Sequence, residues 1–137
     1  EKLCLKDRAY DNFQTLSEGQ KQLVIIARSF VADTKVLFMD EPESSLDFTV
    51  RYDMMETLKK QIVGDKCALI SLHDINLALH FCDKLLLIKD GKISSMVDVV
   101  HEELDFIEKK LQNIYGSIRL QPIKGEDGKE SLIIVKA

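Results

Sequence analysis

Apolar side chains recur at helical spacing in some parts of the chain and form short unbroken runs in others. The helical spacing predicts helices over residues 18–32, 48–62, 75–81 and 102–113. The unbroken runs predict strands over residues 36–39, 67–72 and 84–88, the first two buried on both faces as in a parallel sheet. An Asp-Gly turn predicts a hairpin with residues 93–97, and residues 118–123 and 131–135 form a second predicted hairpin. This order predicts an α/β fold whose sheet has an antiparallel margin.

Polar side chains stand at the predicted starts of two helices. Ser17, followed three residues later by Gln20, has the pattern of a capping box, in which each side chain accepts a hydrogen bond from the other residue's backbone. Asp47 is a good N-cap for the helix over residues 48–62. These three positions therefore have a local structural explanation, whatever else they do.

The charge of the chain narrows the choice of partners. With 137 residues, 45% of them hydrophobic, the chain can bury a sizeable core. Its 19 basic and 23 acidic residues give a net charge of −4, which is the wrong sign for a protein held mainly by phosphate backbones, so no nucleic acid is expected as a partner. No apolar run reaches the roughly 18 residues that a transmembrane helix needs.

Two adjacent acids, Asp40 and Glu41, end the predicted strand over residues 36–39. Because successive strand residues point to opposite sides, one carboxylate can hold Mg²⁺ through water while the other polarises an attacking water. An ordinary solvated loop start explains the same pair equally well. The neighbouring motifs therefore decide between the two interpretations.

Four short motifs follow one another along the chain. They read Leu16-Ser17-Glu18-Gly19-Gln20, then residues 36–41 with Pro42, then Ser45-Leu46-Asp47, then Ser71-Leu72-His73-Asp74. In this order and spacing the chain resembles the ABC ATPases over residues 5–91, whereas the tail after residue 97 matches loosely. The motifs correspond to the signature, the Walker B strand, the D-loop and the switch histidine of that family.

The resemblance implies the C-terminal part of a P-loop NTPase (RecA-like) domain, with a mainly parallel sheet, an antiparallel margin and a terminal hairpin. Residues 1–32 are expected to end a helical subdomain and to contain the signature helix. Residues 33–98 are expected to form the core with the Walker B strand, the D-loop and the switch histidine. Residues 99–137 are expected to add a C-terminal helix and hairpin.

Three residues near the ends of the first two predicted strands gain roles from the resemblance. It implies that Asp40 supports Mg²⁺, that Glu41 is the general base that orients the hydrolytic water, and that His73 contacts the γ-phosphate of ATP. A histidine that merely packs is the alternative for His73, although its place directly after a strand favours the phosphate role.

The signature motif is expected to act in trans. Ser17 and the backbone N–H of Gly19 lie at a predicted helix N-terminus, which attracts anions. In the family this helix end meets the γ-phosphate that the opposite subunit binds. The resemblance also places Gln20 near that nucleotide and Asp47 against the opposite subunit's phosphate site. Helix capping alone is the alternative for Ser17 and Asp47.

Two departures from the family pattern bear on activity. Glu18 replaces the first glycine of the usual signature and adds a carboxylate that can repel a nearby triphosphate. No Gly-x-x-x-x-Gly-Lys-Ser/Thr stretch occurs among the 137 residues. The loop that grips the phosphates of ATP is therefore expected in sequence upstream, and the chain on its own is expected to be inactive.

Within the family, the chain resembles the ATPase subunits of importers for iron-siderophore, haem and cobalamin. This finer resemblance lies in residues 72–79 and 89–93 and in Cys82-Asp83-Lys84 and Tyr115-Gly116. It implies an ATP-hydrolysing subunit that pairs with a second copy as a homodimer and binds membrane permease subunits. Such a subunit is cytoplasmic and lies at the inner face of the cell membrane.

Two other functions are open. The head of a DNA-repair or chromosome ATPase shares these motifs, but such a head follows a long coiled coil, and no sustained heptads precede Leu16. A non-catalytic ABC piece that supplies only Ser17 and Gly19 in trans is the other alternative. The reading frame upstream of Glu1 would distinguish it from an ordinary subunit.

Overall fold

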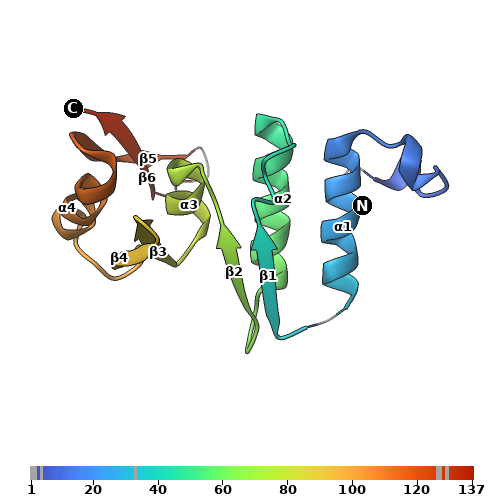
Figure 1. The fold of residues 1–137 in the computed structure, drawn as a ribbon, viewed down its shortest axis with the longest axis horizontal. Coiled ribbons are helices and arrows are strands. Elements are labelled where there is room, and N and C mark those ends of the chain that lie inside the picture. The colour runs from blue at the N-terminus through green and yellow to red at the C-terminus, as the bar shows by residue number, and fades with distance from the viewer. Residues whose placement is uncertain (1–2, 4, 33, 126–127, 129) are drawn as a thin grey trace. The chain divides into compact units, whose positions relative to one another are not determined.

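The computed structural model describes residue 3 and residues 5–32, 34–125, 128 and 130–137. Residue 33, where the second of the three predicted sections begins, lies outside the described residues. The chain divides into two compact units, Glu1–His73 and Asp74–Ala137, whose elements are labelled in Figure 1. Since the division falls directly after His73, every predicted site residue belongs to the first unit.

The first unit combines two longer helices with one pair of parallel strands. β1 and β2 pair in register from Val36 opposite Cys67 to Asp40 opposite Ser71, so both strands end at the same edge. The elements of this unit are the short 3₁₀ helices Lys6–Arg8 and Phe13–Thr15, α1 (Glu18–Val31), β1 (Val36–Asp40), α2 (Phe48–Gln61) and β2 (Cys67–Ser71).

Side-chain caps fix where both helices of the first unit begin. The backbone N–H of Gln20 donates to Oγ of Ser17 at 3.3 Å, and the N–H of Ser17 donates to Oε1 of Gln20 at 3.0 Å. Oδ1 of Asp47 accepts the N–H of Val50 at 3.0 Å. The capping box and the Asp47 cap that the sequence predicts are thereby confirmed.

The prediction that β1 and β2 are buried on both faces is wrong for this structure. Val36, Phe38 and Leu69 are 48%, 73% and 54% exposed on one face of the pair, whereas the opposite face is half-buried. The sheet has two strands, and the described residues of the first unit shield only one of its faces. Unbroken apolar strands of this kind are typical of a sheet that is covered on both faces.

The second unit consists of two hairpins and two helices. Its elements are α3 (Ile75–Phe81), β3 (Lys84–Lys89), β4 (Lys92–Asp98), α4 (Leu104–Tyr115), β5 (Ile118–Lys124) and β6 (Glu130–Lys136). Strands β3 and β4 pair antiparallel, as do β5 and β6, which confirms both predicted hairpins. Asp90 and Gly91 have φ values of 51° and 70°, as a two-residue hairpin turn of type I′ requires.

Packing within the second unit joins α3 to β6 and α4 to β5. Its most buried side chains are apolar and are at most 1% exposed; they are Leu77, Val97, Ile107 and Leu111. Parallel pairing among the described strands is confined to β1 and β2, and the other two sheets are antiparallel. In the part of the chain that the structure describes, no helix has the length and hydropathy to cross a membrane.

Candidate active site

The carboxyl ends of β1 and β2 meet because the two strands are parallel and Asp40 lies opposite Ser71. The Ser71 hydroxyl bridges this edge. Its Oγ donates to Oδ1 of Asp40 at 2.5 Å and accepts the backbone N–H of Glu41 at 2.9 Å. The same N–H also points to the carbonyl oxygen of Ser71, 3.2 Å away. One residue of β2 therefore contacts both adjacent acids.

Glu41 leaves the strand with an unusual backbone. Its φ is 44°, in the left-handed region that residues other than glycine seldom adopt. Backbone strain of this kind costs on the order of 1–3 kcal/mol and gathers at functional sites. The turn directs the Glu41 side chain to His73, whose Nε2 lies 2.6 Å from Oε1 of Glu41.

The pKa of His73 is raised above its ordinary value of 6.5. The main cause is the hydrogen bond with Glu41, followed by the negative charge of the same carboxylate, with smaller contributions from Glu43 and Asp40. Both side chains of the pair are exposed to solvent. The His73 imidazole therefore lies beside the Glu41 carboxylate and keeps its proton to a higher pH than a free histidine does.

The buried side chain of Glu43 contacts the backbone of His73. Its side chain is only 4% exposed, and its Oε1 accepts the backbone N–H of His73 at 3.1 Å. Among the described residues, no hydrogen-bond partner reaches its buried Oε2. A buried carboxylate that is only partly satisfied is costly, so its place beside His73 marks this turn as part of the site.

The start of α1 lies against the turn that follows β1. A Cβ atom at Gly19 would approach the carbonyl oxygen of Ser45 to 2.8 Å, closer than real Cβ atoms come to backbone. Gly19 is therefore needed for space, because its own φ is not in the left-handed region. The turn itself is held by the N–H of Ser44 on the carbonyl of Glu41, 3.2 Å, and that of Leu46 on the carbonyl of Glu43, 3.1 Å.

The predicted site residues thus form two groups in the first unit. Asp40, Glu41 and His73 gather at the strand ends, and the starts of α1 and α2 carry the others: Ser17, Gly19, Gln20 and Asp47. The turn over residues 41–46 lies between the two groups and contacts both. Ser17 and Asp47 serve as helix caps, and both residues are exposed.

Comparison with known proteins points to one family. Residues 1–44, which contain the segment 16–20 and the acids Asp40 and Glu41, match the family model described as ABC transporter. The Phosphonates import ATP-binding protein PhnC of Mesoplasma florum is 37% identical over 117 residues. The match covers 85% of this chain and 45% of that protein, so the chain spans less than half the length of this relative.

Solved structures give the same result. An ABC transporter proposed to be of the metal-chelate type, in an inward-facing conformation, superposes with a TM-score of 0.78 at 21% identity, over 98% of this chain and 53% of that one. The dimeric ABC transporter cassette MJ0796 superposes at 0.66 with 29% identity, over 74% and 44%. The same cassette has also been solved with ADP and Pi.

The chain contains part of an ABC transporter ATP-binding domain. Its fold class, the α/β fold of an ABC ATPase cassette, is the one predicted from the sequence. The roles of the individual site residues and the three sections of the domain stay predictions.

The strand end of this ABC domain offers oxygen ligands of the kind that Mg²⁺ takes. The carboxylate of Asp40 and the hydroxyl of Ser71 lie within 2.5 Å of each other at a solvent-exposed edge. Mg²⁺ commonly keeps several waters and uses one or two protein carboxylates together with phosphates. In the described residues, no group of three or more His, Cys, Asp or Glu side chains could hold a metal alone. The donors at this edge, one carboxylate and one hydroxyl, are of the type that suits Mg²⁺.

Sequence reasoning missed two residues of the ABC domain that the structure brings to the site. Ser71 could have been found, because parallel pairing of the first two predicted strands places it beside Asp40. Glu43 gave no such indication, since an acid in a polar turn ordinarily faces water, and only the fold shows that it is buried.

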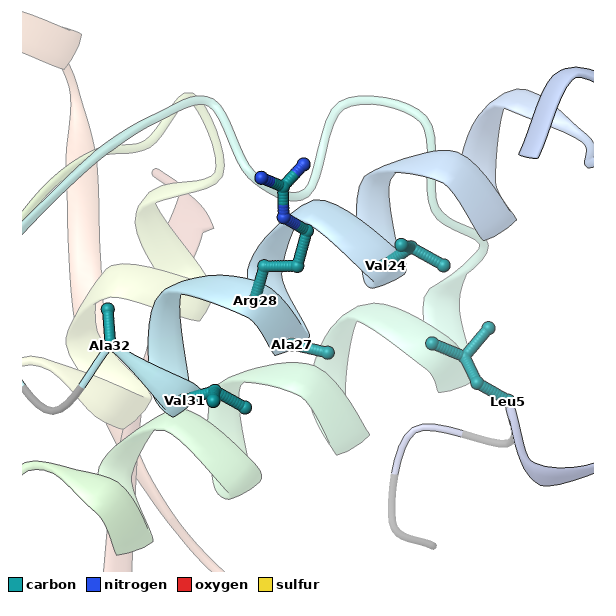
Figure 2. Close-up of a pocket in the computed structure, with 6 residues that line it drawn as sticks. All are labelled: Leu5, Val24, Ala27, Arg28, Val31 and Ala32. Carbon is teal, nitrogen blue, oxygen red and sulfur yellow. The ribbon is translucent and has the colours of Figure 1, made fainter. Parts of the chain in front are cut away.

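An apolar hollow in the ABC domain lies away from these residues, along α1. Figure 2 shows its lining, which is aliphatic except for one guanidinium: Leu5, Val24, Ala27, Arg28, Val31 and Ala32. None of the predicted site residues belongs to it. Its lining suits hydrophobic packing better than binding of a triphosphate, because a single arginine supplies the only charge.

Proposed function

We propose that this chain forms part of an ATP-hydrolysing subunit of an ABC transporter, using ATP and Mg²⁺. The observation that carries the proposal is the pair at the strand ends, in which His73 Nε2 lies 2.6 Å from Oε1 of Glu41. A carboxylate held by an imidazole beside a second acid is suited to orienting a water for attack on a phosphate.

In this proposal Glu41 is the general base. Its Oε1 is held by His73, so its Oε2 accepts a proton from the water that attacks the γ-phosphate. His73 keeps the carboxylate in place and contacts the γ-phosphate of ATP. Its raised pKa favours the protonated imidazole, which can donate to phosphate oxygen.

Asp40 is the proposed metal residue. Bound Mg²⁺ would neutralise charge on the phosphates. Asp40 would hold it through the oxygen that Ser71 leaves available, since the Ser71 hydroxyl occupies Oδ1. Positioning and charge stabilisation supply most of the catalysis of phosphoryl transfer.

Ser17, Gly19 and Gln20 are proposed to meet ATP held by a second subunit. Ser17 is the N-cap of a 14-residue helix, and Gly19 and Gln20 lie in its first turn. The N-terminal N–H groups and the dipole of a helix attract phosphate. Asp47, at the start of α2, is proposed to contact the same opposite subunit. The dimeric form of the similar cassette MJ0796 supports a pair of subunits.

The rest of the nucleotide site is proposed to come from sequence outside these 137 residues. No Gly-x-x-x-x-Gly-Lys-Ser/Thr stretch occurs within them, and the similar phosphonate protein is more than twice as long as the matched region. In the complete domain, residues 1–32, 33–98 and 99–137 are proposed as the end of the helical subdomain, the catalytic core and the C-terminal addition.

The transporter is proposed to be an importer, with permease subunits in the membrane and this subunit on the cytoplasmic side. The name of the similar Mesoplasma florum protein points to phosphonates, whereas the sequence resemblance points to iron-siderophore, haem or cobalamin. The names of the similar phosphonate import proteins favour the first class, so phosphonates are the first substrate to test. Transporter names among the relatives also favour transport over DNA repair.

The proposal is tested with the protein encoded by the complete reading frame that contains this chain. Its ATP hydrolysis is expected to require Mg²⁺, and Glu41→Gln is expected to lower turnover at least about 100-fold while leaving ATP-driven dimerisation intact. Glu103→Gln, at the exposed start of α4, is the matched control and should hydrolyse ATP normally. Unchanged turnover in Glu41→Gln would overturn the role of Glu41, whereas the absence of ATP hydrolysis in the wild-type protein would overturn the proposal and leave the non-catalytic role in trans.

The substrate class is tested by deleting the gene. Loss of growth on a phosphonate as the sole phosphorus source, with normal growth under iron limitation, is the expected result. The reverse pattern would favour import of iron chelates.

A further inference from the structure

We propose that Ser71 is a positioning residue for ATP hydrolysis, holding both strand-end acids in their working arrangement. This role of Ser71 rests on the proposed function of Asp40 and Glu41. Ser71 lies two positions before His73 and has none of the roles proposed for Asp40, Glu41 or His73.

The first contact of Ser71 restrains the side chain of Asp40. A carboxylate at an exposed strand end is free to rotate about its side-chain torsions unless a partner holds it. The Ser71 hydroxyl donates to Oδ1 at 2.5 Å, and hydrogen bonds to an ionised acceptor are among the stronger ones in proteins. One oxygen of Asp40 is thereby fixed, and the direction of the other follows.

The second contact restrains the backbone of Glu41. The same Oγ accepts the N–H of Glu41 at 2.9 Å, at the residue whose φ of 44° is strained. A serine hydroxyl has one proton to donate and lone pairs to accept, and Ser71 uses both functions. Because the strained turn sets the direction of the Glu41 side chain, Ser71 also acts on the contact between Glu41 and His73.

The proposed role of Ser71 depends on its hydroxyl group and not on the size or shape of its side chain. Ser71 is the last residue of β2 and is exposed, so a slightly larger side chain can be accommodated there. Thr keeps the hydroxyl, whereas Val has the shape of Thr without it. The pair Ser71→Thr and Ser71→Val therefore separates hydrogen bonding from packing.

The experiment compares Ser71→Thr, Ser71→Val and Ser71→Ala in the protein from the complete reading frame. Turnover is measured over a range of Mg²⁺ concentrations, binding of Mn²⁺ with ATP is followed by electron paramagnetic resonance, and thermal midpoints report folding. Ser94→Ala, which removes an exposed hydroxyl from β4, is the control. Glu41→Gln is measured alongside.

We expect Ser71→Val and Ser71→Ala to lose about tenfold in kcat and about tenfold in metal affinity, as is typical when a group that orients a metal ligand is removed. Ser71→Thr should restore most of both, and KM for ATP should change little. Equal losses in Ser71→Thr and Ser71→Val, or no loss in Ser71→Val and Ser71→Ala, would overturn the role of Ser71. If Glu41→Gln retains full turnover, the role proposed for Glu41 fails and the role of Ser71 fails with it.

Discussion

His73 and Glu41 are joined side chain to side chain at the ends of two parallel strands, although 32 positions separate them in sequence. The bond exists because β1 and β2 end at one edge, and because Glu41 turns there through a left-handed backbone. Its first measurable consequence is the protonation of the histidine.

Replacing Glu41 with Gln should lower the pKa of His73 towards its ordinary value, because the carboxylate is the main cause of the upward shift. A raised folded-state pKa stabilises the fold below the unfolded pKa of about 6.5, and this contribution is lost as pH rises through the folded pKa. Glu41→Gln should therefore lose more stability at pH 6 than at pH 9. NMR titration of the His73 ring and urea unfolding measure the two effects; an unmoved titration in the variant would contradict the assignment.

Gly19→Ala should destabilise the protein even though alanine favours helices by about 1 kcal/mol over glycine. The new Cβ would lie 2.8 Å from the Ser45 carbonyl oxygen, and relief requires backbone movement. We expect a loss of roughly 1–3 kcal/mol in denaturant unfolding. Glu18→Ala, at the exposed neighbouring position, is the control and should change stability by less than about 0.5 kcal/mol. A more stable Gly19→Ala protein would show that the contact is absent.

Ser17→Asp separates the capping role of Ser17 from a phosphate role. Aspartate is as good an N-cap as serine, so the stability of the protein should be unchanged, whereas Ser17→Ala should lose about 1 kcal/mol. The added negative charge should weaken ATP-driven dimerisation, measured by light scattering, if this helix end meets phosphate. Dimerisation at the wild-type level in Ser17→Asp would show that Ser17 caps the helix and does not contact phosphate.

Glu43→Ala should lower the free energy of unfolding by roughly 0.5–1.5 kcal/mol, because the part-buried backbone N–H of His73 loses its acceptor. Glu43→Gln keeps an acceptor of the same reach and should retain most of the stability. Thermal and urea unfolding of the two variants measure the difference. If both variants unfold like the wild type, the contact between Glu43 and His73 contributes nothing to the fold.

Local features of the fold could be predicted because short-range rules govern them. Ser17 with Gln20 and Asp47 cap their helices as their side-chain chemistry dictates, and Asp90-Gly91 forms the turn that its dihedral preferences favour. The helices and strands begin and end within a few residues of the predicted bounds.

Features that depend on neighbours distant in sequence could not be predicted in the same way. The exposure of Phe38 depends on what covers the sheet, and the burial of Glu43 depends on the path of a turn. The family resemblance of the motifs places Glu41 and His73 in one site. The 2.6 Å contact between them depends on strand register, which cannot be derived from the composition of the strands.

The turn over residues 41–46 contacts two other parts of the first unit. The carbonyl of Ser45 leaves no room for a Cβ atom on Gly19, and the Glu43 carboxylate accepts the backbone N–H of His73. The turn therefore links the first turn of α1 to the backbone of His73, the residue that holds Glu41.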